Sequence, residues 1–187
     1  RMGITIPSST MSDWIRTAAE LIEPLYEALI KKILQSNYLQ VDETRIQVLD
    51  REKENKTHRG WYWTYRDPQS GLVLFDYHES RGRAAPQSML QDFSGYLQSD
   101  GYEVYKEFDK NKITLLHCMA HARRYFEQAL DNDRGLATYA LKEIQKLYAV
   151  ERNCRENNLI CFDRLAQRKE KSVPVLESLH LWLKDQI

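Results

Sequence analysis

The stretch YLQVDETRIQVL, residues 38–49, combines the composition of a β-strand with an adjacent pair of acidic residues. Its Val, Ile, Thr and Leu residues favour a pleated, half-buried surface. Asp42 and Glu43 interrupt that pattern, and a carboxylate in such a setting is usually paired, hydrogen-bonded or bound to a metal ion. Because the two acids have opposite strand parity, we expect Glu43 to point to the other face and to be structural.

A second acidic residue follows a similar run in GYLQSDGY, residues 95–102. This run predicts a short strand over 96–99 that ends at Asp100 and Gly101, and we propose Asp100 as the partner of Asp42. Two simpler interpretations stay open. Asp42 could cap a turn or pair with a surface base, and Asp100 with Gly101 could be an ordinary turn, since Asp-Gly is a common turn dipeptide.

The remaining patterns predict a mixed sheet flanked by helices, an α/β class. Aromatic and β-branched runs predict strands over 61–65, 72–77 and 113–117, and the turn signal DPQSG at 67–71 joins the first two as an antiparallel hairpin. Helices are expected from Gly82 and Pro86 to Gly95, over 102–108, and throughout the chain after residue 121. The aromatic residues of 61–65 could form a stacking platform for nucleic acid, but core packing is favoured.

The N-terminal segment has apolar residues at helical spacing after Ser8-Ser9-Thr10, with Pro24 expected to kink the helix or to begin a second one. A plain amphipathic helix is favoured. The alternative is that IPSSTMSDWI, residues 6–15, forms the recognition part of a helix-turn-helix.

The composition points to a soluble, cytoplasmic protein. The chain has 187 residues and 27 residues of each charge sign, which argues against a strongly basic nucleic-acid clamp but leaves room for a local basic patch. Its three cysteines form no disulfide framework, and no apolar run approaches the roughly 20 residues of a membrane helix. We expect a piece of a longer protein, because the chain opens with Arg1-Met2-Gly3 and ends at Ile187 inside a helical pattern.

Three motifs in order, VDET at 41–44, SDGY at 99–102 and HCMAHARRYF at 117–126, resemble the catalytic region of DDE-type transposases of the IS66 insertion-sequence family. The resemblance implies an RNase H-like five-stranded mixed sheet with flanking helices, N-terminal helices and a C-terminal all-helical region. It divides the chain into an N-terminal helical segment (1–37), a partial catalytic core (38–132) and a helical insertion region (133–187). It also implies a bacterial protein associated with the nucleoid.

In an RNase H-like sheet, the strands that carry Asp42 and Asp100 are neighbours, about 4.7–4.9 Å apart. Their carboxylates would repel each other unless a divalent cation bound between them, and oxygen ligands suit Mg²⁺ or Mn²⁺. The resemblance implies that His121 lies near the active site and contacts the scissile phosphate or orients a water. Arg123 or Arg124 on the same helix would hold the DNA backbone.

Cys118 and His121 have the spacing of half a zinc site, but no second pair follows at a suitable interval, so a structural zinc is not expected. Asp67 and Asp76 are rival metal ligands without a motif partner. The family ends its catalytic triad with a Glu in an Asn-Asn-x-x-x-Glu-Arg-like helix, and no such string occurs in this sequence. We therefore expect the chain alone to be inactive or very weakly active.

The resemblance implies a transposase that cleaves transposon-end DNA, joins the freed 3′ hydroxyl to target DNA and works as a homo-oligomer assembled on DNA. One alternative is an RNase H-like nuclease that cuts without joining. Another is a non-catalytic DNA-binding or assembly module of a decayed mobile element.

Overall fold

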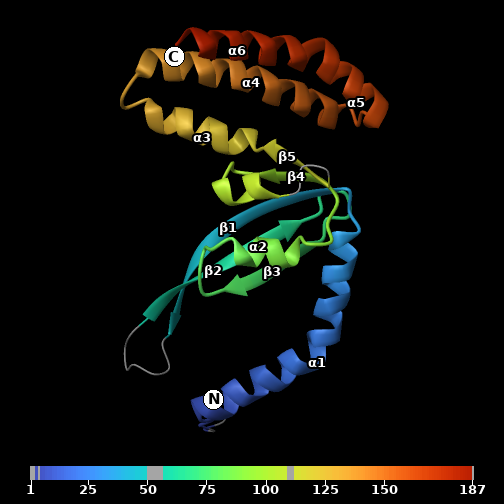
Figure 1. Cartoon of the computed structure of the whole chain (residues 1–187), viewed down its shortest axis with the longest axis vertical. Helices are drawn as coiled ribbons and strands as arrows, with labels where there is room; N and C mark the ends of the chain where they lie inside the picture. Colours follow the sequence, from blue (N-terminus) through green and yellow to red (C-terminus); the bar gives the residue numbers. More distant parts are fainter. Residues whose placement is uncertain (1–2, 4, 50–56, 109–111, 187) are drawn as a thin grey trace. The chain divides into compact units, whose positions relative to one another are not determined.

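The computed structural model describes residues 3, 5–49, 57–108 and 112–186, and these form two compact units, Arg1–His117 and Cys118–Ile187 (Figure 1). Each unit has its own hydrophobic core. The connection at 50–56 between the first two predicted strands lies outside the described residues. The three-part division expected from the sequence stays a prediction.

The first unit is a five-stranded sheet with a long helix before it. Its elements are α1 (Ser8–Leu34), β1 (Tyr38–Leu49), β2 (Thr57–Arg66), β3 (Val73–His78), α2 (Ala84–Met89), β4 (Gly95–Ser99), the 3₁₀ helix η1 (Glu103–Glu107) and β5 (Ile113–His117). The strand order is β3-β2-β1-β4-β5. The first three strands pair antiparallel, whereas β1 with β4 and β4 with β5 are parallel. The mixed sheet of an RNase H-like α/β fold is thereby confirmed.

The hairpin between β2 and β3 closes through the predicted turn. The Asp67 amide donates to the Leu72 carbonyl at 3.0 Å, and the Gly71 amide donates to the Asp67 carbonyl at 2.9 Å. The Asp67 carboxylate accepts from the Gln69 amide at 2.9 Å and from the Ser70 hydroxyl at 2.6 Å. Asp67 is therefore a turn residue.

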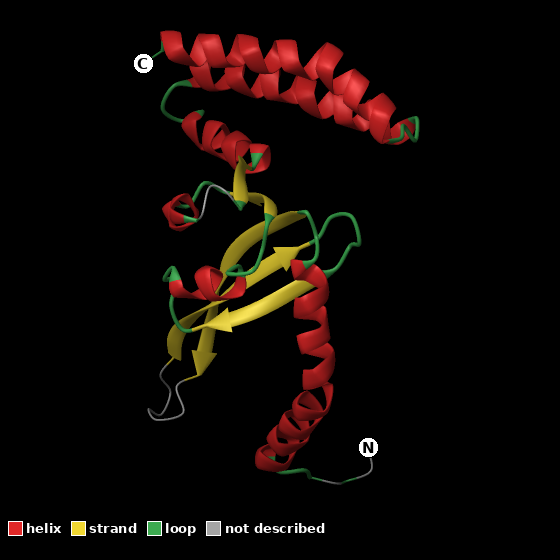
Figure 2. Ribbon diagram, turned by 45° about the vertical axis from the view of Figure 1, so that its right-hand side comes forward, coloured by secondary structure: helices red, strands yellow, loops and turns green. Residues whose placement is uncertain are grey.

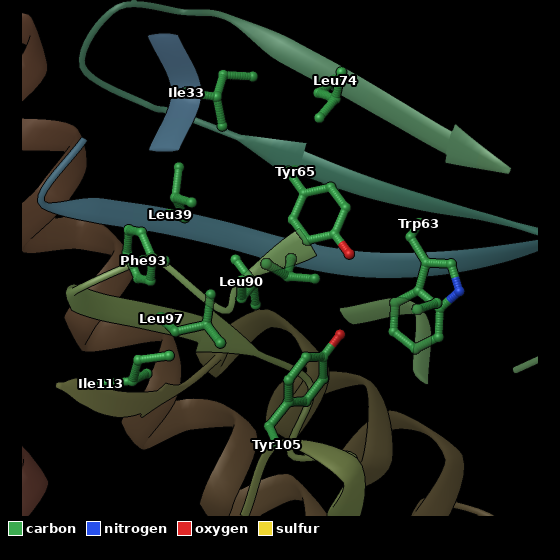
Figure 3. Packing of buried hydrophobic residues seen from close by; sticks show 12 residues of the cluster. Ile33, Leu39, Trp63, Tyr65, Leu74, Leu90, Phe93, Leu97, Tyr105 and Ile113 are labelled. Atoms are coloured by element: carbon green, nitrogen blue, oxygen red, sulfur yellow. The ribbon is translucent and has the colours of Figure 1, made fainter. Parts of the chain in front are cut away.

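One face of the sheet carries the core, where β1, β2 and β4 contribute alternate side chains (Figure 3). Trp63 and Tyr65 are fully buried, so the core interpretation of the β2 aromatics is confirmed for them. Tyr62 has the opposite strand parity and is 36% exposed, and its ring meets those of Phe75 and Tyr77 edge-on.

Helix α1 is continuous and contains Pro24, and Figure 1 shows that it bends along its length. A single helix over this segment fits the prediction of a plain amphipathic helix. Only its end joins the core, through the buried Ile33. Two other helices differ from expectation: α2 ends at Met89, well before Gly95, and the helix predicted over 102–108 is a 3₁₀ turn. Gly95 instead belongs to β4, and its amide donates to the Lys112 carbonyl at 2.9 Å.

The second unit is helical throughout (Figure 2). It contains α3 (Met119–Ala129), α4 (Arg134–Glu156), α5 (Cys161–Gln167), the π-helical turn η2 (Arg168–Ser172) and α6 (Val173–Asp185). Asp133 caps α4 by accepting from the Leu136 amide at 3.0 Å. The rings of Tyr139 and Trp182 pack with their centroids 4.4 Å apart. None of the helices in the described ranges has the length and apolarity needed to cross a bilayer.

Candidate active site

The parallel pairing of β1 with β4 ends just before Asp42 and Asp100. The two strands pair in parallel, with Gln40 opposite Gln98 as the last pair of the ladder. Asp42 lies two residues further along β1, and Asp100 lies two residues after Gln98, directly after the end of β4 at Ser99. The Gln40 side-chain amide donates to the Gln98 Oε1 at 2.8 Å, so side chains of this parity meet on one face. The neighbouring strands and matched register are those expected for the acidic pair.

Short hydrogen bonds orient both carboxylates. Asp42 is exposed, and its Oδ1 accepts from the Glu43 amide at 2.9 Å. Asp100 is half-buried, and its Oδ1 accepts from the Tyr102 amide at 2.8 Å. Asp100 thus does stabilise a local turn, as the simpler interpretation requires. The same turn presents its carboxylate at the end of β4, so the turn and the site are compatible.

Glu43 points to the opposite, buried face, as its parity predicts. Its side chain is only 1% exposed, and its Oε1 accepts two hydrogen bonds from Arg81, one from Nε at 2.7 Å and one from Nη2. Burial raises the pKa of Glu43 above its ordinary value, against the opposing effect of Arg81, and the charges of Asp100 and Asp42 raise it further.

Arg81 connects the two strands that carry the acidic pair. Its guanidinium carbon lies 4.1 Å from the ring centroid of Tyr102 and 5.3 Å from that of Trp61. The Tyr102 hydroxyl donates to the Arg81 carbonyl at 3.3 Å. Arg81 therefore contacts both Glu43, which follows Asp42, and the residue whose amide holds Asp100. The sequence analysis did not identify Arg81. The available signal was Glu43, because an acid that points into the core requires a cation as its partner.

The interior beside Glu43 is unusually polar. Among the described residues, Glu43 Oε2, the Tyr65 and Tyr105 hydroxyls and Trp63 Nε1 are buried without a hydrogen-bond partner. Figure 3 shows the two hydroxyls pointing toward each other. Burial raises the pKa of both tyrosines, and the nearby charge of Glu43 adds to the effect. Both hydroxyls therefore stay protonated.

His117, at the end of β5, is a neighbour of the site that the sequence analysis did not single out. It pairs with Ser99 in the parallel register, one residue before Asp100. Gly101 has φ +90°, and a β-carbon at that position would lie 3.2 Å from His117 Nδ1. The imidazole thus lies against the backbone that carries Asp100.

The other predicted site residues, His121, Arg123 and Arg124, belong to α3 in the second unit. The His121 amide donates to the Cys118 carbonyl at the start of this helix. Arg123 is half-buried and forms an ion pair with Glu127, whereas Arg124 is exposed. Their roles at the acidic site stay predictions.

The rival carboxylates have structural partners. Asp67 holds the hairpin turn described above, where hydrogen bonds from Ser70 and Gln69 lower its pKa. Asp76 Oδ2 lies 2.9 Å from His78 Nε2 on the same strand, β3. Neither residue belongs to the acidic pair.

The donor chemistry of the acidic pair fits a hard divalent cation. Within the described ranges, no group of three or more His, Cys, Asp or Glu residues could hold a metal ion. Magnesium, however, commonly binds one or two carboxylates and completes its shell with waters and substrate phosphates. A pair of carboxylates suits that coordination, which Mn²⁺ also accepts, better than it suits a structural zinc.

Comparison with known proteins places the chain in a family. The model described as "Transposase IS66 family" matches residues 1–187. The chain belongs to the IS66 transposase family. This is a DDE-type transposase family.

Similar proteins occur in Sinorhizobium fredii (strain NBRC 101917 / NGR234). The uncharacterized proteins y4hP and y4jD are 28% and 29% identical to this chain, over 97% and 98% of its length. The uncharacterized protein y4qI is 27% identical over 99% of it. The chain spans only 36%, 38% and 37% of these three relatives, respectively. No solved structure matches the chain.

Proposed function

We propose that this chain is part of the catalytic region of a transposase that cleaves transposon-end DNA and joins the 3′ hydroxyl to target DNA. The observation that supports the proposal is the parallel β1–β4 register, whose last pair, Gln40 opposite Gln98, lies two residues before Asp42 and Asp100. The family match over the whole chain supplies the substrate class.

Asp42 and Asp100 would hold Mg²⁺ or Mn²⁺ through their carboxylates. A pair of such ions, when bound, activates the attacking oxygen and stabilises the leaving oxygen in an in-line displacement at phosphorus. The chain's own residues keep the two carboxylates in place: Arg81 binds the residue after Asp42 and stacks on Tyr102, which holds Asp100. His121 would contact the scissile phosphate or orient a water, and Arg123 or Arg124 would hold the DNA backbone.

We assign no third catalytic carboxylate within this chain, so catalysis belongs to the parent protein. Assembly on paired transposon ends would make that protein a homo-oligomer on DNA. The 187-residue chain alone should bind metal weakly and cut DNA poorly or not at all.

Cleavage of labelled transposon-end DNA by the parent protein in Mg²⁺ tests the acidic pair. Asp42→Asn and Asp100→Asn should each lower the cleavage rate at least about 100-fold, since even partners that only orient a metal ligand are worth about 10–100-fold. Asp92→Asn removes an exposed carboxylate elsewhere in the first unit and should leave the rate within about twofold. Undiminished cleavage by the Asp42 variant would refute the assignment.

Adding target DNA to the same reaction separates joining from simple hydrolysis. A transposase gives products in which the transposon 3′ end is covalently joined to target DNA. Cleaved ends without joined products would instead identify a nuclease, and no cleavage together with metal-independent DNA binding would identify an assembly module.

Anomalous diffraction from crystals soaked in Mn²⁺ tests the metal site without an activity assay. We expect a peak between the carboxylates of Asp42 and Asp100 that disappears in Asp42→Ala. A peak that persists in that variant, or one bound only to other residues, would contradict the proposed ligand pair.

A further inference from the structure

A groove of about 500 Å³ opens on the second unit and is rich in arginine. Four of its eight lining residues are Arg123 from α3, Arg152 and Arg155 from α4, and Arg164 from α5. The only carboxylate among the lining residues is that of Glu151.

Helical geometry explains why α4 contributes so much of this lining. Tyr148, Arg152 and Arg155 follow one another at spacings of four and three residues, so they share one face of the helix. Arg152 and Arg155 are about 4.5 Å apart along the helix axis. Arg152 and Arg155 are exposed on this face, whereas Tyr148 packs against the core of the unit, and Arg123 and Arg164 line the groove from the other two helices.

The positive charge of the groove is only partly neutralised inside the protein. Arg168 donates two hydrogen bonds to Glu151, at 2.6 and 2.8 Å, and Arg123 pairs with Glu127. Within the described part of the chain, Arg152, Arg155 and Arg164 form no ion pair, and the buried Arg164 Nε has no hydrogen-bond partner. Three guanidinium groups are thus left for an external anion.

The pKa of Glu151 shows that the arginines make the groove electrostatically positive. Hydrogen bonding from Arg168 lowers the pKa of Glu151, and the charges of Arg168, Arg164 and Arg155 lower it further. The arginines therefore act together on one point of the groove. A chain with equal numbers of acidic and basic residues concentrates an excess of cations here.

We propose that this arginine groove binds the phosphodiester backbone of DNA. The guanidinium fork matches phosphate oxygens with two parallel hydrogen bonds, which favours arginine over lysine at such a site. The proposal rests on the proposed function for its ligand. It extends the expected role of Arg123 to residues of α4 and α5 that the family motifs do not contain.

The salt dependence of DNA binding by the 187-residue chain tests the groove. Fluorescence anisotropy with a labelled duplex of about 20 base pairs, between about 50 and 200 mM salt, gives the slope of log K against log salt. The variant Arg152→Gln with Arg155→Gln should bind at least about tenfold more weakly, and its slope should be shallower by about 1.8.

A matched control removes two cations from the same unit outside the groove. Lys142→Gln with Lys184→Gln, both at exposed helical positions, should change the slope by much less. Circular dichroism of both variants checks that the helices are intact. Equal changes in the two variants would show a net-charge effect and would overturn the proposal. So would unchanged binding by the groove variant, or no DNA binding by the unsubstituted chain.

Competition with polyglutamate distinguishes DNA from an acidic protein partner. Loss of polyglutamate binding in the groove variant, with DNA binding retained, would make the groove a protein-docking site and would refute the proposal. The binding assay is run in chelator, so it does not depend on Asp42 or Asp100. The groove proposal can therefore be refuted while the cleavage result for Asp42 still supports the proposed function. Conversely, the cleavage result can refute the acidic pair while DNA binding by the groove is confirmed.

Discussion

Arg81 binds Glu43 from the far side of the strand that presents Asp42, with two guanidinium nitrogens on one carboxylate oxygen. The carboxylate is almost fully buried, whereas the guanidinium is 38% exposed between Trp61 and Tyr102. The interaction therefore stabilises an acid that could not otherwise remain charged in the interior. Arg81 also connects Glu43, the residue after Asp42, with Tyr102, which follows Asp100 by two residues.

Arg81→Met should destabilise the chain by about 2–4 kcal/mol, because it leaves the Glu43 carboxylate buried without its cation. Adding Glu43→Leu should recover part of that loss, since the double variant no longer buries a charge. Urea denaturation of the two single variants and the double variant measures the free energies of unfolding.

The exposed pair of Arg16 and Asp13 is the control for this cycle, since both side chains are more than 60% exposed. Arg16→Met should cost no more than about 0.5 kcal/mol. If Arg81→Met cost as little, the buried pair would not be holding this part of the sheet.

Gly101→Ala should disturb the acidic site more than it disturbs stability. Its φ of +90° is unfavourable for alanine, and the new methyl group would press on His117 beside Asp100. Gly71→Ala is the control, because its φ is +75° but its β-carbon would meet nothing within 4 Å. Both variants should lose about 1–2 kcal/mol of unfolding free energy. Mn²⁺ affinity, measured by calorimetry, should fall only in Gly101→Ala. An equal fall in both would count against local displacement of Asp100.

Asp67→Asn should cost about 1 kcal/mol at neutral pH, because the ionised carboxylate accepts hydrogen bonds that hold the hairpin turn. These bonds lower the pKa of Asp67 in the folded state below its ordinary value of 3.8. The folded state therefore binds fewer protons than the unfolded state in that range. The stability supplied by the carboxylate is complete above about pH 5 and is lost as pH falls below 3.8.

Unfolding measured from neutral to acidic pH should show the difference between wild type and Asp67→Asn shrinking below that value. Asp92→Asn, at an exposed position, should give a much smaller difference throughout. A difference for Asp67→Asn that grew on acidification would reverse the expected sign.

The three cysteines should react with a thiol reagent in the order of their exposure. Cys161 is exposed, Cys118 is half-buried and Cys154 is fully buried. Mass spectrometry after timed labelling should find Cys161 modified first and Cys154 modified only on unfolding. In Cys161→Ser the fast phase should disappear; its persistence would mean that another thiol is accessible.

Local patterns were sufficient for most of the first unit. Strand-favouring composition predicted β1 and β5 with the bounds observed, and Asp67, Pro68 and Gly71 predicted the hairpin. Parity correctly separated Asp42 from Glu43. These strands, this turn and this parity depend on residues that are close in sequence, so they can be predicted from local sequence patterns.

Features that depend on distant segments could not be predicted in the same way. Arg81 reaches Glu43 across 38 positions, through β2, β3 and the loop that follows them, and nothing local distinguishes it from Arg83. The arginine groove likewise requires the packing of α5 against α4, and although helices were expected throughout this region, their packing and the π-helical turn were not. That the strands leading to Asp42 and Asp100 are neighbours was expected only through the resemblance to a family.

The opposite orientations of Asp42 and Glu43 also make β1 intolerant of misalignment. A shift of one residue against β2 would bring Asp42 into the apolar interior and turn Glu43 away from Arg81 toward the surface. A mispaired strand would thus lose its ion pair and bury a carboxylate that has no cation. Two adjacent acids therefore encode the alignment of the central strand, in addition to any chemistry that one of them performs.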